Sequence, residues 1–268
     1  MKVLLLLFFT SSFVVFGQTL EYSIGKIHQL ESGILNESRR VNVHLPLNFS
    51  QDSTYPVLYV LDGSAHEDFL HIVGLVQFFQ LQFVMPDFIV VGIENVDRKR
   101  DFTFYPKDTS LLADIPAAGH SDKFIQFIET ELQPFIESNY KTNETKYIIG
   151  QSLGGLLAGE ILIKKPELFS HYFIVSPSFW WDDEVLLKVA PDLFSKQEIP
   201  REFVYIAVGV DEHIIMRRDA KKLAKLLKKS GSVTKQLEFN KLKNEDHATV
   251  LHNAIYQGLE ILYPAIKY

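Results

Sequence analysis

The chain contains no cysteine among its 268 residues. This absence excludes a thiolate nucleophile, an iron–sulfur cluster and a cysteine-ligated zinc ion, and the fold must do without disulfide bonds. With 47% hydrophobic and 22% charged residues, the composition is that of an ordinary globular protein. A chain of this length buries a large core, so we expect one domain stabilised by packing alone.

An excess of positive charge is also missing. The formal net charge is −6, whereas a nucleic-acid-binding surface requires a concentrated basic face. Nucleic acid is therefore not an expected partner. After residue 17 no apolar run approaches the length that crosses a bilayer, so we expect no stable membrane insertion of the mature chain. The sequence makes no prediction of the oligomeric state.

The first 17 residues form a separate segment. One basic residue, Lys2, precedes two short apolar runs, and small Gly17 follows them. This order is typical of a secretory signal peptide. An uncleaved membrane anchor is the alternative, but the run is short and Thr10–Ser12 interrupt it. We predict a signal peptide at 1–17, a single domain at 18–268, and export to the periplasm or the medium, most simply from a bacterial cell.

Strand and helix patterns alternate along the mature chain. Alternating apolar and polar residues over Leu20–Leu47 predict antiparallel strands. Almost wholly apolar runs, typical of strands buried on both faces of a parallel sheet, occur at Pro56–Asp62, Phe88–Ile93, Lys146–Gly150, His171–Ser176 and Phe203–Val208, with a last strand expected at Thr234–Phe239. Helical periods occur at Ser121–Tyr140 (with a kink at Pro134), Leu153–Lys165, Arg217–Ser230 and Val250–Leu262. The sequence therefore predicts an α/β fold with a mainly parallel sheet, helices on both faces, and antiparallel strands at the N-terminal edge.

A G-x-S-x-G motif carries the strongest chemical signal. Residues 150–155 read Gly-Gln-Ser-Leu-Gly-Gly, directly after an apolar strand and directly before a helix. Strand, tight turn and helix together form the nucleophile elbow of α/β-hydrolases. Without that setting the motif would be a glycine-rich turn with an incidental serine. We predict Ser152 as a nucleophile.

A serine nucleophile needs a base and an acid. In the α/β-hydrolase order both follow the serine, with the histidine last. Of the nine histidines, His247 lies in a polar loop between the last strand and the closing helix, and we predict it as the base. The acid is expected after the strand at 203–208, where Glu212 is preferred over Asp211. Alternatively, both carboxylates are solvated and the enzyme works with a Ser–His dyad.

Two backbone N–H groups are expected to bind the oxyanion. Leu153, directly after the nucleophile, supplies one, and Ser64, in the loop after the first central strand, supplies the other. Gly63 permits a close approach there, and Asp62 is expected to anchor the loop rather than to react.

A second pattern superficially resembles a zinc motif. His66 and His71 flank an acidic segment, but their spacing separates them by about 140° on a helix instead of placing them on one face. We expect no metal site and no organic cofactor.

Five segments, in order along the chain, resemble the putative esterase family of α/β-hydrolases, which includes esterase D-like proteins and siderophore trilactone esterases. They are Leu58–Gly63, Gly92–Asp101, Gly150–Gly155, Ser176–Trp181 and Glu245–His247. The resemblance implies an α/β-hydrolase fold and hydrolysis of a small-molecule carboxylic ester, with Ser152 as nucleophile and His247 as base. It also favours Glu212 as the acid.

The resemblance suggests four substrate-binding residues. Arg98 and Arg100 match a loop near the substrate in siderophore hydrolases, where cations suit anionic catecholates; alternatively they form structural pairs with Asp97 and Asp101. Trp180 and Trp181 would wall an acyl or aryl pocket, or else belong to the core. Substrate specificity is expected in two loops, 64–83 and 102–120.

The leading hypothesis is an exported serine esterase that forms an acyl-enzyme on Ser152. Siderophore lactones, aryl esters and acylated sugars all suit the scaffold. Two alternatives use the same fold: an acyltransferase with the same triad, and a non-catalytic ligand-binding homologue.

Overall fold

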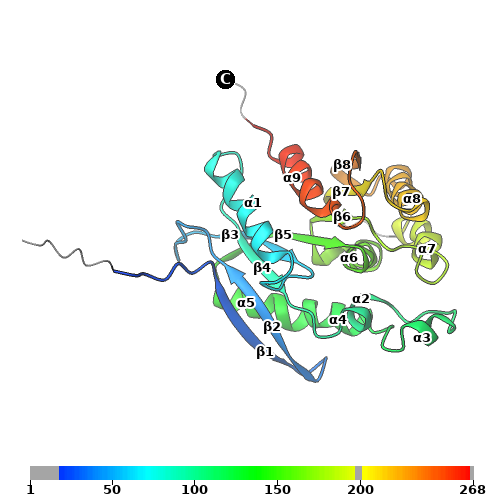
Figure 1. The fold of residues 1–268 in the computed structure, drawn as a ribbon, viewed down its shortest axis with the longest axis horizontal. Coiled ribbons are helices and arrows are strands. Elements are labelled where there is room, and N and C mark those ends of the chain that lie inside the picture. The colour runs from blue at the N-terminus through cyan, green and yellow to red at the C-terminus, as the bar shows by residue number, and fades with distance from the viewer. Residues whose placement is uncertain (1–17, 197–200, 266–268) are drawn as a thin grey trace, which may run out of the picture.

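The computed structural model describes residues 18–196 and 201–265, and within them one sheet of eight strands lies between two layers of helices (Figure 1). The strands are β1 (Lys26–Ser32), β2 (Glu37–His44), β3 (Tyr55–Val60), β4 (Ile89–Ile93), β5 (Thr142–Gln151), β6 (His171–Val175), β7 (Arg201–Gly209) and β8 (Val233–Leu242). Their spatial order is β1-β2-β4-β3-β5-β6-β7-β8. β2 pairs antiparallel with both β1 and β4, and all remaining pairs are parallel. The predicted fold class is confirmed.

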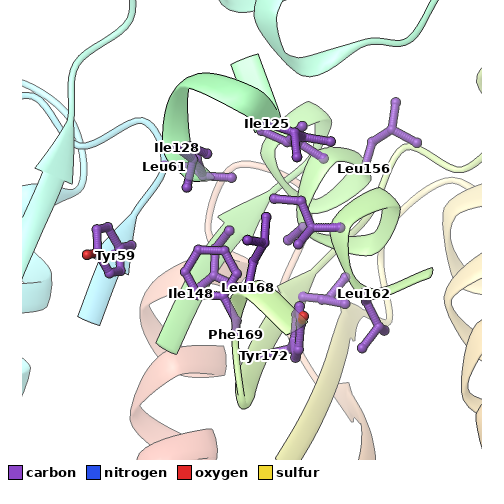
Figure 2. Packing of buried hydrophobic residues seen from close by; sticks show 14 of the residues in the cluster. Tyr59, Leu61, Ile125, Ile128, Ile148, Leu156, Leu162, Leu168, Phe169 and Tyr172 are labelled. Carbon is purple, nitrogen blue, oxygen red and sulfur yellow. The ribbon is translucent and has the colours of Figure 1, made fainter. Parts of the chain in front are cut away.

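Each face of the sheet has its own core. Because successive strand residues point to opposite faces, Leu58 and Val60 of β3 pack beneath α1 (Phe69–Leu81) and α9 (Val250–Leu262). Tyr59 belongs to the opposite core, which is covered by α4 (Ser121–Phe127), α5 (Gln133–Asn139), α6 (Leu153–Lys164), α7 (Val185–Phe194) and α8 (Ile214–Ser230). In Figure 2, Tyr59 and Ile148 of the sheet appear with Leu156 and Leu162 of α6. The shorter helices are α2 (Arg98–Phe102), α3 (Leu111–Asp114) and η2 (Pro166–Leu168).

The helix predicted at Ser121–Tyr140 differs in its middle. Between α4 and α5 the chain forms a π-helical segment, η1 (Ile128–Leu132). Pro134 lies in the first turn of α5. Proline has no N–H for the usual helical bond, and its ring collides with the preceding turn. A wider turn accommodates both effects, so the expected kink takes the form of a π-bulge.

Besides the short helices α2, α3 and η2, two longer helices were not predicted. Most of the segment 64–83, expected as a loop, is helix α1, and α7 lies in a stretch to which no element was assigned. α1 is apolar on nearly all sides, with Phe78 and Leu81 exposed beside a buried face. It therefore lacks the one-sided stripe by which an amphipathic helix is recognised.

The predicted signal peptide lies outside the described residues and stays a prediction. Among the helices that the structure describes, none is long and apolar enough to cross a membrane.

Candidate active site

Ser152 occupies a strained turn between β5 and α6. Its backbone angles are φ 60° and ψ −117°, a region that residues with side chains rarely adopt and that costs on the order of 1–3 kcal/mol. The surrounding backbone fixes the turn: the Ser152 N–H donates to Val175 O at 3.1 Å, and the Ser152 carbonyl accepts from Leu156 N at 2.9 Å. The serine hydroxyl is thereby presented at the carboxyl end of the central strands, where α/β sheets bind ligands.

Glycines around Ser152 make this turn sterically possible. A Cβ on Gly150 would lie 2.3 Å from Gly154 O, and one on Gly155 would lie 2.8 Å from Val175 O. Side chains would collide at both positions. The glycines of the motif therefore have the steric function that a nucleophile elbow requires.

His247 and Glu212 come together from separate loops. His247 Nδ1 lies 2.8 Å from Glu212 Oε2. An ionised carboxylate only accepts hydrogen bonds, so Nδ1 is the donor in this contact, and in the neutral imidazole Nε2 is then the nitrogen without a proton. The Gln151 side chain donates to the His247 carbonyl at 2.6 Å and so ties the histidine loop to the residue before Ser152.

The Glu212 carboxylate is buried and accepts hydrogen bonds at both oxygens. Burial alone would raise its pKa, but hydrogen bonds from His247, Ser176 and the Gly209 N–H hold that pKa below the ordinary value. Glu212 is therefore an anion that can orient imidazole and stabilise imidazolium. Asp211, the alternative acid, is exposed, and its backbone N–H bonds to Glu245 O.

The Ser152 hydroxyl contacts Ser178. The two Oγ atoms are 3.4 Å apart, and the Ser178 N–H also donates to the Ser152 carbonyl at 3.0 Å. Among residues 18–196 and 201–265, no hydrogen bond joins Ser152 to His247. Nucleophile–base hydrogen bonds are often long in unliganded enzymes and tighten when substrate binds.

The two predicted oxyanion donors lie on adjacent segments. Leu153 begins α6, so its N–H points out of the helix N-terminus. The Ser64 N–H makes a long contact of 3.4 Å to the Glu67 carboxylate. At Gly63, a Cβ would lie 2.4 Å from the backbone of Gly92, so the close approach expected of this glycine is present.

Arg98 and Arg100 are both paired with carboxylates. Arg98 binds Asp62 with two hydrogen bonds and has 32% of its side chain exposed. Arg100 binds Glu37 through two nitrogens and Asp101 through Nε at 2.7 Å. The structural alternative therefore holds for Arg100, which pairs with Asp101, whereas the partner of Arg98 is Asp62 and neither Asp97 nor Asp101.

The two tryptophans have different environments. Trp181 is fully buried, and its indole N–H donates to Phe104 O at 3.0 Å. Because no part of its side chain reaches the surface, Trp181 fits the core alternative better than the wall of a substrate pocket. Trp180 is 39% exposed beside it and remains a candidate pocket residue.

The histidines of the zinc-like pattern do not meet. His66 is exposed, whereas the ring of His71 on α1 contacts that of His252 on α9, with centroids 4.1 Å apart. Within the described ranges, no group of three or more His, Cys, Asp or Glu side chains is arranged to hold a metal ion.

Sequence reasoning missed the roles of two serines. Both serines follow β6. Ser176 donates a hydrogen bond to Glu212, and the hydroxyl of Ser178 contacts that of Ser152. The available signal was positional, because both residues directly follow a strand of the parallel sheet, where active-site residues of such folds gather.

A parallel sheet of this order, with a serine in a strained strand–turn–helix and a carboxylate–histidine pair beyond the last strands, defines the class of α/β-hydrolases. The sequence model of the family described as "Putative esterase" matches residues 32–255. The chain therefore belongs to that esterase family.

Named relatives and solved structures agree with this assignment. The chain is 29% identical over 254 residues to ferri-bacillibactin esterase BesA of Bacillus subtilis, an alignment that covers 85% of this chain and 87% of the relative. An IroE-like serine hydrolase from Shewanella oneidensis superposes with a TM-score of 0.80 at 28% identity, covering 91% of this chain and 82% of the other. The BES protein from Bacillus cereus superposes with a TM-score of 0.79 at 27% identity, covering 92% and 98%.

Proposed function

We propose that the chain is a serine hydrolase that cleaves carboxylic esters through an acyl-enzyme on Ser152. The observation that carries the proposal is the strained backbone of Ser152 at the elbow, in a fold whose next loops bring His247 and Glu212 into hydrogen-bond contact. Backbone strain in a non-glycine residue persists where the site requires it. Membership of the esterase family supports the same reaction class.

The chemistry follows from the three side chains. His247 Nε2 accepts the Ser152 proton as Oγ attacks the ester carbonyl, and Glu212 stabilises the imidazolium that forms. The N–H groups of Leu153 and Ser64 bind the oxyanion. His247 then protonates the departing alcohol and activates a water molecule, which releases the acid and restores Ser152.

Siderophore esters are the proposed substrate class. BesA is named as a ferri-bacillibactin esterase, and a relative from Aspergillus fumigatus as a siderophore triacetylfusarinine C esterase. We propose that the mature chain is exported, on the basis of the first 17 residues. Mass spectrometry of protein secreted by the producing cell tests this, with a mature chain beginning at Gln18 as the expected result.

Hydrolysis of p-nitrophenyl butyrate by the purified mature chain tests the enzymatic proposal. Ser152→Ala is expected to abolish the activity, and Ser138→Ala, which alters an exposed serine on α5, is expected to leave it unchanged. Wild type that binds siderophores but cleaves no ester would instead indicate a non-catalytic homologue. Preferential formation of a new ester when alcohols are added would indicate an acyltransferase.

A siderophore panel tests the substrate class. Iron-loaded and iron-free trilactone siderophores are offered beside feruloyl esters and acetylated sugars, and products are separated by chromatography. The proposal expects the highest kcat/KM on a siderophore. A higher kcat/KM on both other classes would refute this substrate class while leaving the ester chemistry in place.

A further inference from the structure

Arg98 connects two segments that are distant in sequence. Its Nε and Nη2 atoms donate to the two carboxylate oxygens of Asp62 at 2.6 and 2.9 Å, and Nη2 also donates to the carbonyl of Gln151 at 3.2 Å. One guanidinium therefore bridges the loop after β3 and the residue before the elbow. A planar guanidinium with several donors can make such a bridge, whereas a single ammonium cannot reproduce its geometry.

Asp62 and Gln151, the two residues that Arg98 connects, lie at the same sequence distance from the two predicted oxyanion donors. Asp62 lies two residues before Ser64, and Gln151 lies two residues before Leu153. β3 and β5, which lead to these segments, are neighbouring parallel strands. The distance between the two N–H groups therefore depends on how the two strand ends are held together, and Arg98 is placed to hold them.

The rest of the Asp62 environment fits a positioning role. Asp62 is 93% buried, has a positive φ of 54°, and accepts a further hydrogen bond from Asn95 at 2.7 Å. Its carboxylate lies against the elbow, because a Cβ on Gly154 would be 3.3 Å from Oδ2. The Arg98 guanidinium also lies 5.5 Å from the ring centre of Phe102. These contacts fix both partners of the ion pair and satisfy the charge of Arg98 within the protein.

We propose that Arg98 is a positioning residue that sets the geometry of the oxyanion hole, rather than a residue that recognises substrate charge. This inference rests on the proposed ester hydrolysis. A displacement of either N–H by a fraction of an ångström weakens stabilisation of the transition state more than binding of the ground-state ester. Substitution of Arg98 is therefore expected to lower kcat, and to lower it equally for neutral and anionic esters.

Steady-state kinetics of three variants test the proposal. Arg98→Lys keeps the positive charge without the bridging geometry, Arg98→Ala removes both, and Lys99→Ala removes an exposed positive charge from the next residue as the matched control. On neutral p-nitrophenyl butyrate, both Arg98 variants are expected to lower kcat about 10- to 100-fold while KM changes less than about twofold. The affinity for an alkylboronic acid, which mimics the tetrahedral intermediate, falls by a similar factor, and Lys99→Ala matches wild type.

Other outcomes refute the inference. Arg98 variants with wild-type kcat on the neutral ester would refute it, as would a defect confined to the KM of an anionic ester. Thermal unfolding shows whether a variant has lost activity because it is unfolded or because its oxyanion donors are displaced. If Arg98→Ala does not fold, the kinetics of the more conservative variant Arg98→Lys decide. If wild type itself cleaves no ester, the proposed function fails; if wild type is active and the Arg98 variants equal Lys99→Ala, only this inference fails.

Discussion

The Ser176 hydroxyl donates a hydrogen bond to Oε1 of Glu212, while Oε2 of the same carboxylate contacts His247. Ser176 is fully buried and has a positive φ of 44°. A serine in a conformation that favours glycine, with its hydroxyl on the acid of the candidate site, indicates that the hydroxyl has a function there. Ser176 therefore supports the anionic form of Glu212.

Ser176→Ala is expected to raise the pKa of the Glu212 carboxyl. Hydrogen bonds lower the pKa of Glu212, so loss of one donor moves this pKa upward, by about 0.5 to 1 unit. Titration of the Glu212 side-chain carboxyl by carbon-13 NMR measures the shift. Ser176→Gly, which removes the hydroxyl and also relieves the positive φ, should raise the pKa equally. An unmoved pKa in both variants would leave Ser176 only a structural role.

Neutralising Glu212 and Asp211 separately tests which carboxylate acts as the acid. Glu212→Gln is expected to lower kcat on the order of 10²- to 10⁴-fold, because His247 loses the anion that orients it and stabilises its charge. Asp211→Asn alters an exposed side chain and should keep activity within about twofold of wild type. The opposite ranking in a p-nitrophenyl butyrate assay would make Asp211 the acid, and equal, small effects would favour a Ser–His dyad.

Asp68 is expected to make the stability of the fold depend on pH. Burial, with the nearby charges of Asp62 and Glu67, raises the pKa of Asp68 to about 7. The folded state therefore binds this proton more tightly than the unfolded chain, and this contribution to stability falls as pH rises from about 4 to about 7. Asp68→Asn, at the start of α1 where the side chain makes no capping bond, should stabilise the protein at pH 8 and not at pH 4. The expected gain is on the order of 1 kcal/mol after allowance for solvent screening.

Urea unfolding at the two pH values measures the effect of Asp68→Asn. Asp52→Asn serves as the control, because Asp52 is exposed and its carboxylate has no partner among the described residues. A stability difference from wild type that is the same at pH 4 and pH 8 would show that the charge of Asp68 is not its cause.

Substitutions of the two tryptophans are expected to have different effects, on stability for Trp181 and on substrate binding for Trp180. Trp181→Phe leaves the Phe104 carbonyl without its buried indole donor, so we expect a loss of about 1–3 kcal/mol in the free energy of unfolding. Trp180→Ala changes a partly exposed ring and should chiefly raise KM for aryl esters. Denaturant unfolding and steady-state kinetics on both variants check this, and an equal loss of stability in the two would contradict the assignment.

Much of the fold was predictable because the signals are local. Short apolar runs between helical periods indicated the parallel sheet, and the strand–glycine–helix sequence indicated the turn at Ser152. Helix α1 was not predicted because apolar residues lie on nearly all of its sides instead of in one stripe. The π-bulge was not predicted because a proline in a helical pattern indicates that the helix is distorted, but does not indicate the geometry of the distortion.

The sequence by itself determined the sheet, the elbow and the candidates Ser152, His247 and Glu212, because backbone sterics and burial act over a few neighbouring residues. Tertiary structure decided which of the adjacent residues Asp211 and Glu212 faces His247. It also placed Trp181 inside the core and paired Arg98 with Asp62. Each of these outcomes depends on which distant segments pack together, and side chains one residue apart can then lie in opposite environments.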